Sequence, residues 1–299
     1  MRFHQALTFL PTAQVLPLAR ACEAAGYQGV YLSDHLFNPR DLRSRYTYSS
    51  RPDGLPEWEK ETAWPDPMCV FSALSSVTER LTLTTGVYVA PARDLITVAK
   101  TVGTAAVLSG DRVRLGVGTG WCEEEFALTG QDFATRGRRL DEMIGALRAL
   151  WQGGWVEHHG AFYDVPACQM EPSPSRPVPI LAGGHSKPAL RRAATLCDGW
   201  IAAGAYQEDE AWAHLGALRT ALEVAGRTLE GFTVYLSLAV APDLDLYRRF
   251  EEAGVTDLVC APWLFARIPP GTDEAGRLAA RTAACERFAE AFVAPMARG

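Results

Sequence analysis

Short apolar or β-branched runs alternate with amphipathic helical patterns along the whole chain. The runs that predict strands lie at 3–9, 29–33, 81–89, 113–118, 178–182, 199–203, 232–240 and 256–261. The patterns with helical spacing lie at 15–25, 66–78, 93–108, 133–151, 187–196, 207–225, 244–253 and 273–294. Because a helix follows each strand and this unit recurs along the chain, the sequence predicts an α/β protein with a (β/α)₈ TIM barrel. We expect one domain over residues 1–299.

Two segments interrupt the repeat. A long polar loop at 38–65 follows the second predicted strand, and a long loop at the carboxyl end of a barrel strand often covers an active site. It contains the aromatic residues Tyr46, Tyr48, Trp58 and Trp64. After the fourth predicted helix, residues 153–177 are expected to form an inserted hairpin and a proline-rich return.

Composition narrows the class of protein. Of 299 residues, 48% are hydrophobic and 21% charged, with a net charge of −6, as in ordinary globular proteins. The negative charge and the lack of a basic run argue against nucleic-acid binding. No apolar run reaches the roughly 18 residues of a membrane span. Seven dispersed cysteines and an N-terminus without a signal-peptide pattern favour a cytoplasmic protein, and the histidines form no metal-binding pattern.

The second predicted strand runs directly into Ser33, Asp34 and His35. Barrel enzymes carry their chemistry at the carboxyl ends of the strands, and histidine is the usual proton donor or acceptor near neutral pH. His35 is therefore a candidate acid or base, which Asp34 could orient. The same pattern also fits a turn capped by Asp34 beside a surface histidine.

Glycines mark the ends of three further strands. In "ILAGGHSKP", Gly183 and Gly184 precede a helix opened by Pro188, and such a turn offers free N–H groups to a phosphate. An ordinary capped turn is the alternative. "LGVGTGWCEEEF" has alternating glycines that allow a close backbone approach, and "TTGVYVAP" ends the third strand with a bulge or simply at Pro91.

Together these stretches resemble the luciferase-like monooxygenase family, most closely its branch that uses the deazaflavin coenzyme F420. The resemblance rests on "YLSDH", "LTLTTGVYVAPARDLITVAKTVGTAAVLSGDRVRLGVGTGW", "RGRRLDEMIGALRALW", "HGAFYDV" and "PVPILAGGHSKPALRRAATLCDGW" in this order, and covers residues 1–204 best. It implies a flavin-like ring at the barrel mouth, a small-molecule substrate and a homodimer.

The resemblance also implies site residues. His35 is the catalytic acid or base, and no metal is expected. A non-prolyl cis peptide is expected at Val87-Tyr88 or the next bond. The predicted cofactor-binding residues are Asp34, Val87, Tyr88, Ala90, Gly118, Thr119, Gly120, Trp121, Glu124, Ala182, Gly183, Gly184 and His185.

The chain departs from relatives that oxidise sugar phosphates or alcohols. They carry a glutamate near the end of the first strand, where this chain has "LTFLPTA". Pro39 replaces a tryptophan four residues after the histidine, and Trp121 replaces a glutamate. The expected function is an F420-dependent oxidoreductase that transfers hydride between the deazaflavin C5 and a small, apolar substrate. An FMN-dependent monooxygenase and a non-catalytic cofactor-binding paralogue are the alternatives.

Overall fold

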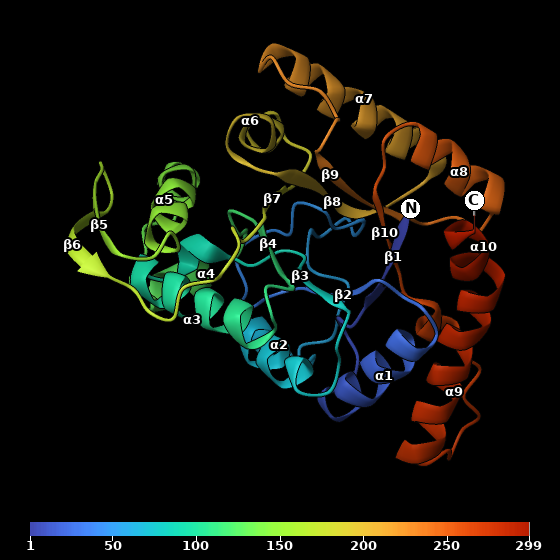
Figure 1. Ribbon diagram of the computed structural model, residues 1–299. Coiled ribbons are helices and arrows are strands. Elements are labelled where there is room, and N and C mark those ends of the chain that lie inside the picture. Colours follow the sequence, from blue (N-terminus) through green and yellow to red (C-terminus); the bar gives the residue numbers. More distant parts are fainter. Residues whose placement is uncertain (299) are drawn as a thin grey trace.

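The computed structural model describes residues 1–298 and confirms the predicted barrel (Figure 1). Eight parallel strands close in the order β1-β10-β9-β8-β7-β4-β3-β2. The barrel strands are β1 (Arg2–Ala6), β2 (Gly29–Leu32), β3 (Thr82–Thr85), β4 (Val113–Val117), β7 (Ile180–Gly183), β8 (Gly199–Tyr206), β9 (Thr233–Leu238) and β10 (Asp257–Cys260). All eight carboxyl ends therefore meet at one mouth of the barrel.

Helices surround the strands, as Figure 1 shows. They are α1 (Thr12–Ala24), α2 (Pro67–Ser75), α3 (Leu95–Leu108), α4 (Glu123–Leu128), α5 (Arg136–Leu150), α6 (Lys187–Leu196), α7 (Glu208–Val224), α8 (Leu244–Glu252), α9 (Glu274–Phe288) and α10 (Ala294–Ala297). Short 3₁₀ turns at η1 (Ala90–Ala92) and η2 (Pro262–Phe265) and a π-helical turn, η3 (Ala289–Val293), complete the set. The short helix α4 was not among the eight predicted helices; it holds two residues of the site.

The apolar core of the described residues has three parts, one of which is a small cluster of Val89, Ala92 and Phe126. A large cluster of buried side chains lies between the strands and the surrounding helices. A smaller cluster, Leu181, Ile201 and Tyr235, fills the barrel itself together with Tyr31, Val87 and Val259. Because the barrel is packed with side chains, a ligand can enter only above this inner layer, at the mouth.

The two interruptions lie where the sequence predicts them. β5 (Trp155–His159) and β6 (Asp164–Gln169) form an antiparallel hairpin, which stands out beyond α5 at the edge of the molecule in Figure 1. Residues 38–65, called the cover loop below, contain no helix or strand. Asn38 ties the two ends of this loop together, because its Nδ2 donates to the carbonyls of Lys60 and Thr62 at 2.9 and 3.1 Å.

Other expectations can be compared with the described residues. No helix within residues 1–298 is both long and apolar enough to cross a membrane. All seven cysteines are free thiols. In the same part of the chain, no group of three or more His, Cys, Asp or Glu side chains is arranged to hold a metal ion.

Candidate active site

A cavity of about 790 Å³ opens at the carboxyl ends of the barrel strands. Its walls come from the carboxyl-terminal parts of the barrel strands, including β8 and β9, and from the loops after β1, β2, β3, β4, β7 and β10, and the cover loop closes one side. The volume lies within the range of ordinary ligand sites. Its lining is largely aromatic and aliphatic, and includes Phe9, Tyr31, Trp58, Trp64, Trp121, Tyr235 and Leu264.

Ser33 and Asp34 fix the backbone of the strand beside them. The Ser33 hydroxyl donates to the Gly86 carbonyl at 2.8 Å. The Asp34 carboxylate accepts from the Val89 N–H at 2.9 Å and pairs with both terminal nitrogens of Arg93, at 2.7 and 2.9 Å. The end of β2 therefore holds both sides of the irregular segment that follows β3. Asp34 lines the cavity, but Val89 and Arg93 already bind its two oxygens.

A non-prolyl cis peptide lies in this segment, at Gly86-Val87. The predicted position, Val87-Tyr88 or the next bond, was wrong by one residue, because the irregularity begins directly after Gly86. Pairing with β4 resumes at once, since the Tyr88 N–H donates to the Gly116 carbonyl at 2.7 Å. The bulge expected at the end of the third strand is thus present.

Val87 points into the barrel between two glycines. A Cβ built on Gly118 would lie 2.4 Å from a Val87 methyl group, and one on Gly183 would lie 2.3 Å from the other. Any larger residue at either position would displace Val87. The glycines at the ends of β4 and β7 therefore make room for the protein's own side chain, a role that the sequence patterns did not indicate.

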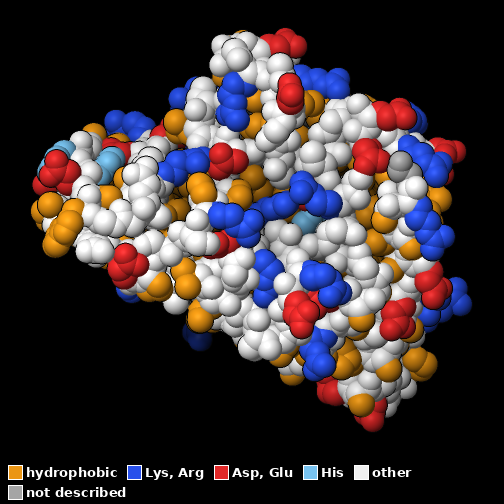
Figure 2. Space-filling view, in the orientation of Figure 1, with side chains coloured by type: hydrophobic (Ala, Val, Ile, Leu, Met, Phe, Trp, Pro, Cys, Tyr) orange, Lys and Arg blue, Asp and Glu red, His pale blue; other side chains and the backbone are white. Residues whose placement is uncertain are grey.

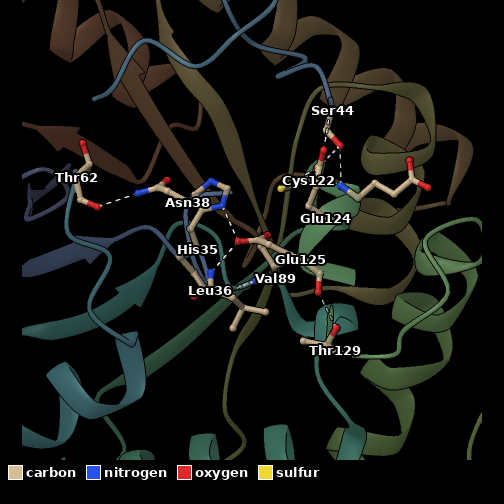
Figure 3. Close-up of polar contacts among 12 residues, drawn as sticks. His35, Leu36, Asn38, Ser44, Thr62, Val89, Cys122, Glu124, Glu125 and Thr129 are labelled. Carbon is tan, nitrogen blue, oxygen red and sulfur yellow. Dashed lines mark hydrogen bonds and ion pairs between the residues drawn. The ribbon is translucent and has the colours of Figure 1, made fainter. Parts of the chain in front are cut away.

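His35 lies at the cavity, and its ring contacts a buried glutamate (Figure 3). His35 Nδ1 is 3.0 Å from Glu125 Oε1, which also accepts the Leu36 N–H at 2.7 Å. Glu125 is completely buried, on the first turn of α4. The pair leaves Nε2 as the ring nitrogen without a bonded partner among residues 1–298.

Three indole rings surround His35. The ring centroids of Trp58, Trp64 and Trp121 lie 5.4, 4.7 and 5.4 Å from that of His35. We call these three residues the aromatic box. Phe9, from the stretch where the sugar-phosphate and alcohol enzymes have a glutamate, packs on Trp64 with centroids 5.5 Å apart. The surroundings of His35 are therefore apolar and exclude most water.

Glu124 faces away from His35. Its carboxylate accepts from the Arg43 N–H at 2.6 Å and, as Figure 3 shows, from the Ser44 hydroxyl at 2.7 Å; both residues lie in the cover loop. Partial burial raises the pKa of Glu124, but these hydrogen bonds outweigh it and lower the pKa to about 2. The contact is therefore present above the ordinary glutamate range and is lost only as the pH falls through about 2. Glu124 fastens the cover loop to α4.

We expect Glu124→Ala to loosen the cover loop. Losing contacts worth about 1 kcal/mol should speed trypsin cleavage after Arg40, Arg43 or Arg45 by about fivefold. Glu123→Ala is the matched control, because the Glu123 side chain has no hydrogen bond to the loop and only its backbone N–H reaches Ser44. Equal cleavage of both variants and the wild type would show that Glu124 does not hold the loop.

The turn between β7 and α6 forms the opposite end of the cavity. Gly184 has φ +108°, a conformation that favours glycine, and its N–H donates to the Ile201 carbonyl at 3.1 Å. The N–H groups of His185, Ser186 and Lys187 have no bonded acceptor within residues 1–298, so a helix N-terminus offers free donors here. His185 Nδ1 lies 2.8 Å from the Tyr206 hydroxyl.

The structure brings most of the predicted residues together. Of these, Asp34, His35, Val87, Gly118, Thr119, Gly120, Trp121, Gly183, Gly184 and His185 line the cavity. Tyr88, Ala90, Ala182 and Glu124 do not. Tyr88 and Ala90 are buried on the opposite side of the backbone from Val87 and Val89, which line the cavity, and Ala182 lies within β7. The sequence patterns did not single out Glu125.

Positive side chains gather over the middle of the face shown in Figure 2, where the cover loop crosses the barrel in Figure 1. The cover loop itself carries Arg40, Arg43, Arg45, Arg51 and Lys60. Arg45 and Arg136 line the cavity. Arg45 and Arg136 thus bring positive charge to the outer part of the site, although the cover loop as a whole carries as many acidic as basic side chains, whereas the part around His35 is apolar.

Comparisons with known proteins identify the family. The model for the luciferase-like monooxygenase family matches residues 4–266. An uncharacterized protein of Mycobacterium tuberculosis is 37% identical over 303 residues, covering 98% of this chain and 99% of that protein. An F420-dependent glucose-6-phosphate dehydrogenase of Nakamurella multipartita is 29% identical over 244 residues, covering 80% of this chain and 67% of that enzyme.

A solved structure shares the fold. An F420-dependent secondary alcohol dehydrogenase in complex with an F420-acetone adduct superposes with a TM-score of 0.72 at 15% identity, over 97% of both chains. At this identity the likeness concerns the fold alone. The family model covers most of the chain and is decisive: the chain belongs to the luciferase-like monooxygenase family.

Proposed function

We propose that this protein is an oxidoreductase that uses the deazaflavin coenzyme F420 and acts on a small, apolar organic substrate. The observation that carries the proposal is His35, a histidine held at the apolar end of the cavity with one ring nitrogen left for a ligand. The relative of Nakamurella multipartita, named for the same coenzyme, supports the choice of coenzyme.

The residues present fit such a coenzyme. The cavity extends from the aromatic box to the free N–H groups before α6, which suits a molecule with a flat ring at one end and a phosphate at the other. Val87, held between Gly118 and Gly183, offers an apolar surface beneath a ring. The free N–H groups of His185 and Ser186 would hold the phosphate, and Gly184, which has no side chain, would leave room for it.

When bound, the deazaflavin supplies a ring carbon, C5, that gives or accepts a hydride. Hydride transfer is accompanied by transfer of a proton, which a side chain of the protein must supply or accept. His35 would do so at Nε2. General acid–base groups of this kind contribute about 10²–10⁴ in rate. The aromatic box and Phe9 keep water from the reacting groups and select an apolar substrate, because no carboxylate stands at the end of β1.

Cofactor titration tests the proposal. We expect the protein to bind F420 more tightly than FMN, and reduced F420 to be oxidised in the absence of oxygen when a suitable apolar carbonyl or enone compound is added. Tighter binding of FMN with oxygen consumption would make the protein a monooxygenase instead. Binding of F420 without turnover across a broad substrate panel would favour a non-catalytic cofactor-binding protein.

Gly184→Val tests the phosphate end. A Cβ there would lie 3.2 Å from both the Ala189 methyl group and the Tyr48 hydroxyl, and the positive φ disfavours any side chain. We expect binding of complete F420 to weaken by at least about tenfold, roughly 1.4 kcal/mol. A truncated deazaflavin without the phosphate should bind almost as before, in titrations followed by fluorescence.

Gly226→Val is the matched control for this experiment. Gly226 also has a positive φ, +68°, but lies in the turn after α7, where a Cβ meets no atom within 4 Å. The control should carry the backbone cost and leave both affinities unchanged, with circular dichroism as the check on folding. Equal losses for both ligands in Gly184→Val would place the phosphate elsewhere.

A further inference from the structure

Glu125 is a buried carboxylate that the proposed hydride transfer does not itself require. It has no exposed surface, and it does not line the cavity. Among residues 1–298 its one ion-pair partner is His35, and no lysine or arginine lies within pairing distance. Its second oxygen, Oε2, is buried without any hydrogen-bond partner. Burying a charged group costs free energy unless the group is paired. The position of the Glu125 carboxylate therefore needs an explanation.

The geometry determines which nitrogen of His35 carries a proton. Glu125 Oε1 accepts the Leu36 N–H, so this oxygen already acts as an acceptor. An ionised Glu125 has no proton to give, and His35 Nδ1 is then the donor across the 3.0 Å contact. The neutral ring then has a bare Nε2, which is the form that can accept a proton from a ligand.

We propose that Glu125 is a positioning residue for His35: it fixes the Nδ1–H tautomer and balances the positive charge that the ring gains when Nε2 takes a proton. This proposal rests on the proposed function for its catalytic consequence, but the tautomer itself is a property of the protein alone. Because Leu36 follows His35 in the chain, one oxygen holds both the ring and its backbone. A rotated ring would break its contact with that oxygen.

Neighbouring carboxylates on α4 therefore have separate tasks. Glu124 holds the cover loop, and Glu125 holds the histidine beneath it. The same helical turn thus joins the loop that carries Trp58 and Trp64 to the ring that these residues surround. Matched substitutions at the two positions can separate the tasks.

Two substitutions of Glu125 divide its roles. Glu125→Gln keeps an oxygen that can accept from Nδ1 and from Leu36, but removes the charge. Glu125→Met keeps similar bulk and removes both. If the reaction is the proposed one, we expect kcat to fall by about tenfold for Gln and about 100-fold or more for Met. KM for the substrate and the Kd for F420 should stay within about threefold, since Glu125 does not line the cavity.

The tautomer is read directly by ¹⁵N NMR of histidine-labelled protein, with the His35 signals assigned by their loss in His35→Gln. We expect wild type and Glu125→Gln to carry the proton on Nδ1, and Glu125→Met to lose this preference. A wild-type ring that stays protonated on both nitrogens, but not in Glu125→Met, also supports the pair. Glu124→Met is the control: loosening the cover loop shifts the indole rings around His35, but the proton should stay on Nδ1, because Glu125 still holds it.

The outcomes separate this inference from the proposed function. A wild-type ring with its proton on Nε2 and a bare Nδ1 overturns the inference, whether or not the variants fold. Unchanged signals and turnover in Glu125→Met do the same. If the wild type shows no turnover with F420 but the NMR signals behave as expected, the positioning role stands and the proposed reaction fails.

Discussion

His35→Ala should lower the turnover of substrate by about 100-fold or more, or roughly 2.7 kcal/mol of transition-state stabilisation, with coenzyme affinity changed only a few-fold. The variant lacks the nitrogen that would hold the proton. The coenzyme should still bind, because the free N–H groups before α6 and the Val87 surface lie on other strands. Steady-state kinetics with the native substrate and a coenzyme titration provide the measurement.

The loss could also arise from packing, because three indoles rest on the His35 ring. His35→Phe is the matched control: it keeps an aromatic ring in the aromatic box and removes both nitrogens. We expect it to be as inactive as alanine, but more stable than His35→Ala, because the ring keeps its packing although Glu125 loses its partner in both variants. Recovery of turnover in His35→Phe would mean that the ring acts by filling space and not by proton transfer.

The sequence alone predicted the barrel because the strand–helix pattern occurs eight times along the chain. Each strand is a short apolar run and each helix an amphipathic one, so an error at one boundary leaves the eightfold alternation intact. The carboxyl ends of the strands then define the site. This is why His35, Gly118 and Gly184, far apart in the chain, could all be expected at one cavity and are found there.

Finer features depend on contacts that periodicity does not encode. Glu123, Glu124 and Glu125 are residues of the same type, but successive side chains along a helix point in directions about 100° apart. One glutamate lines the cavity, one meets the cover loop and one meets His35. Which glutamate meets which partner depends on the path of the irregular cover loop, and no local sequence pattern predicts that path.

The segment after β3 shows the same limit. "TTGVYVAP" indicated a bulge, but its position depends on how Gly86 and Val87 fit against Gly118 and Gly183 on other strands. An error of one residue exchanges the side chain that faces the barrel for one that faces the core. Tyr88 was therefore expected at the cofactor and is found buried, with Arg93 4.1 Å above its ring.

Asp34→Ala should destabilise the protein by about 3 kcal/mol or more, since it removes one partner of a buried charge pair. The Asp34 side chain is 1% exposed and that of Arg93 11%. Without Asp34 the Val89 N–H also loses its acceptor. Asp66, 3.7 Å from Arg93, is the remaining carboxylate near that guanidinium and is half-exposed. Urea unfolding followed by circular dichroism gives the change in stability.

Arg51 and Asp53 provide a matched comparison for this prediction. They also form a two-point contact, with Nε–Oδ1 and Nη2–Oδ2 at 3.0 and 2.7 Å, but on the exposed cover loop. Water screens that pair, so Asp53→Ala should leave the unfolding midpoint nearly unchanged. The same kinds of charged group, buried in one pair and exposed in the other, thus compare the effect of burial on the cost of losing an aspartate.

The double variant Asp34→Ala/Arg93→Met provides the second comparison. It removes the unpaired guanidinium as well, and should recover part of the stability that Asp34→Ala loses. If the double variant is as unstable as the sum of the two single changes, the two residues act independently. The Asp34 carboxylate would then stabilise the end of β2 through the Val89 N–H alone. Arg93 would be held in position by its contact with the Tyr88 ring.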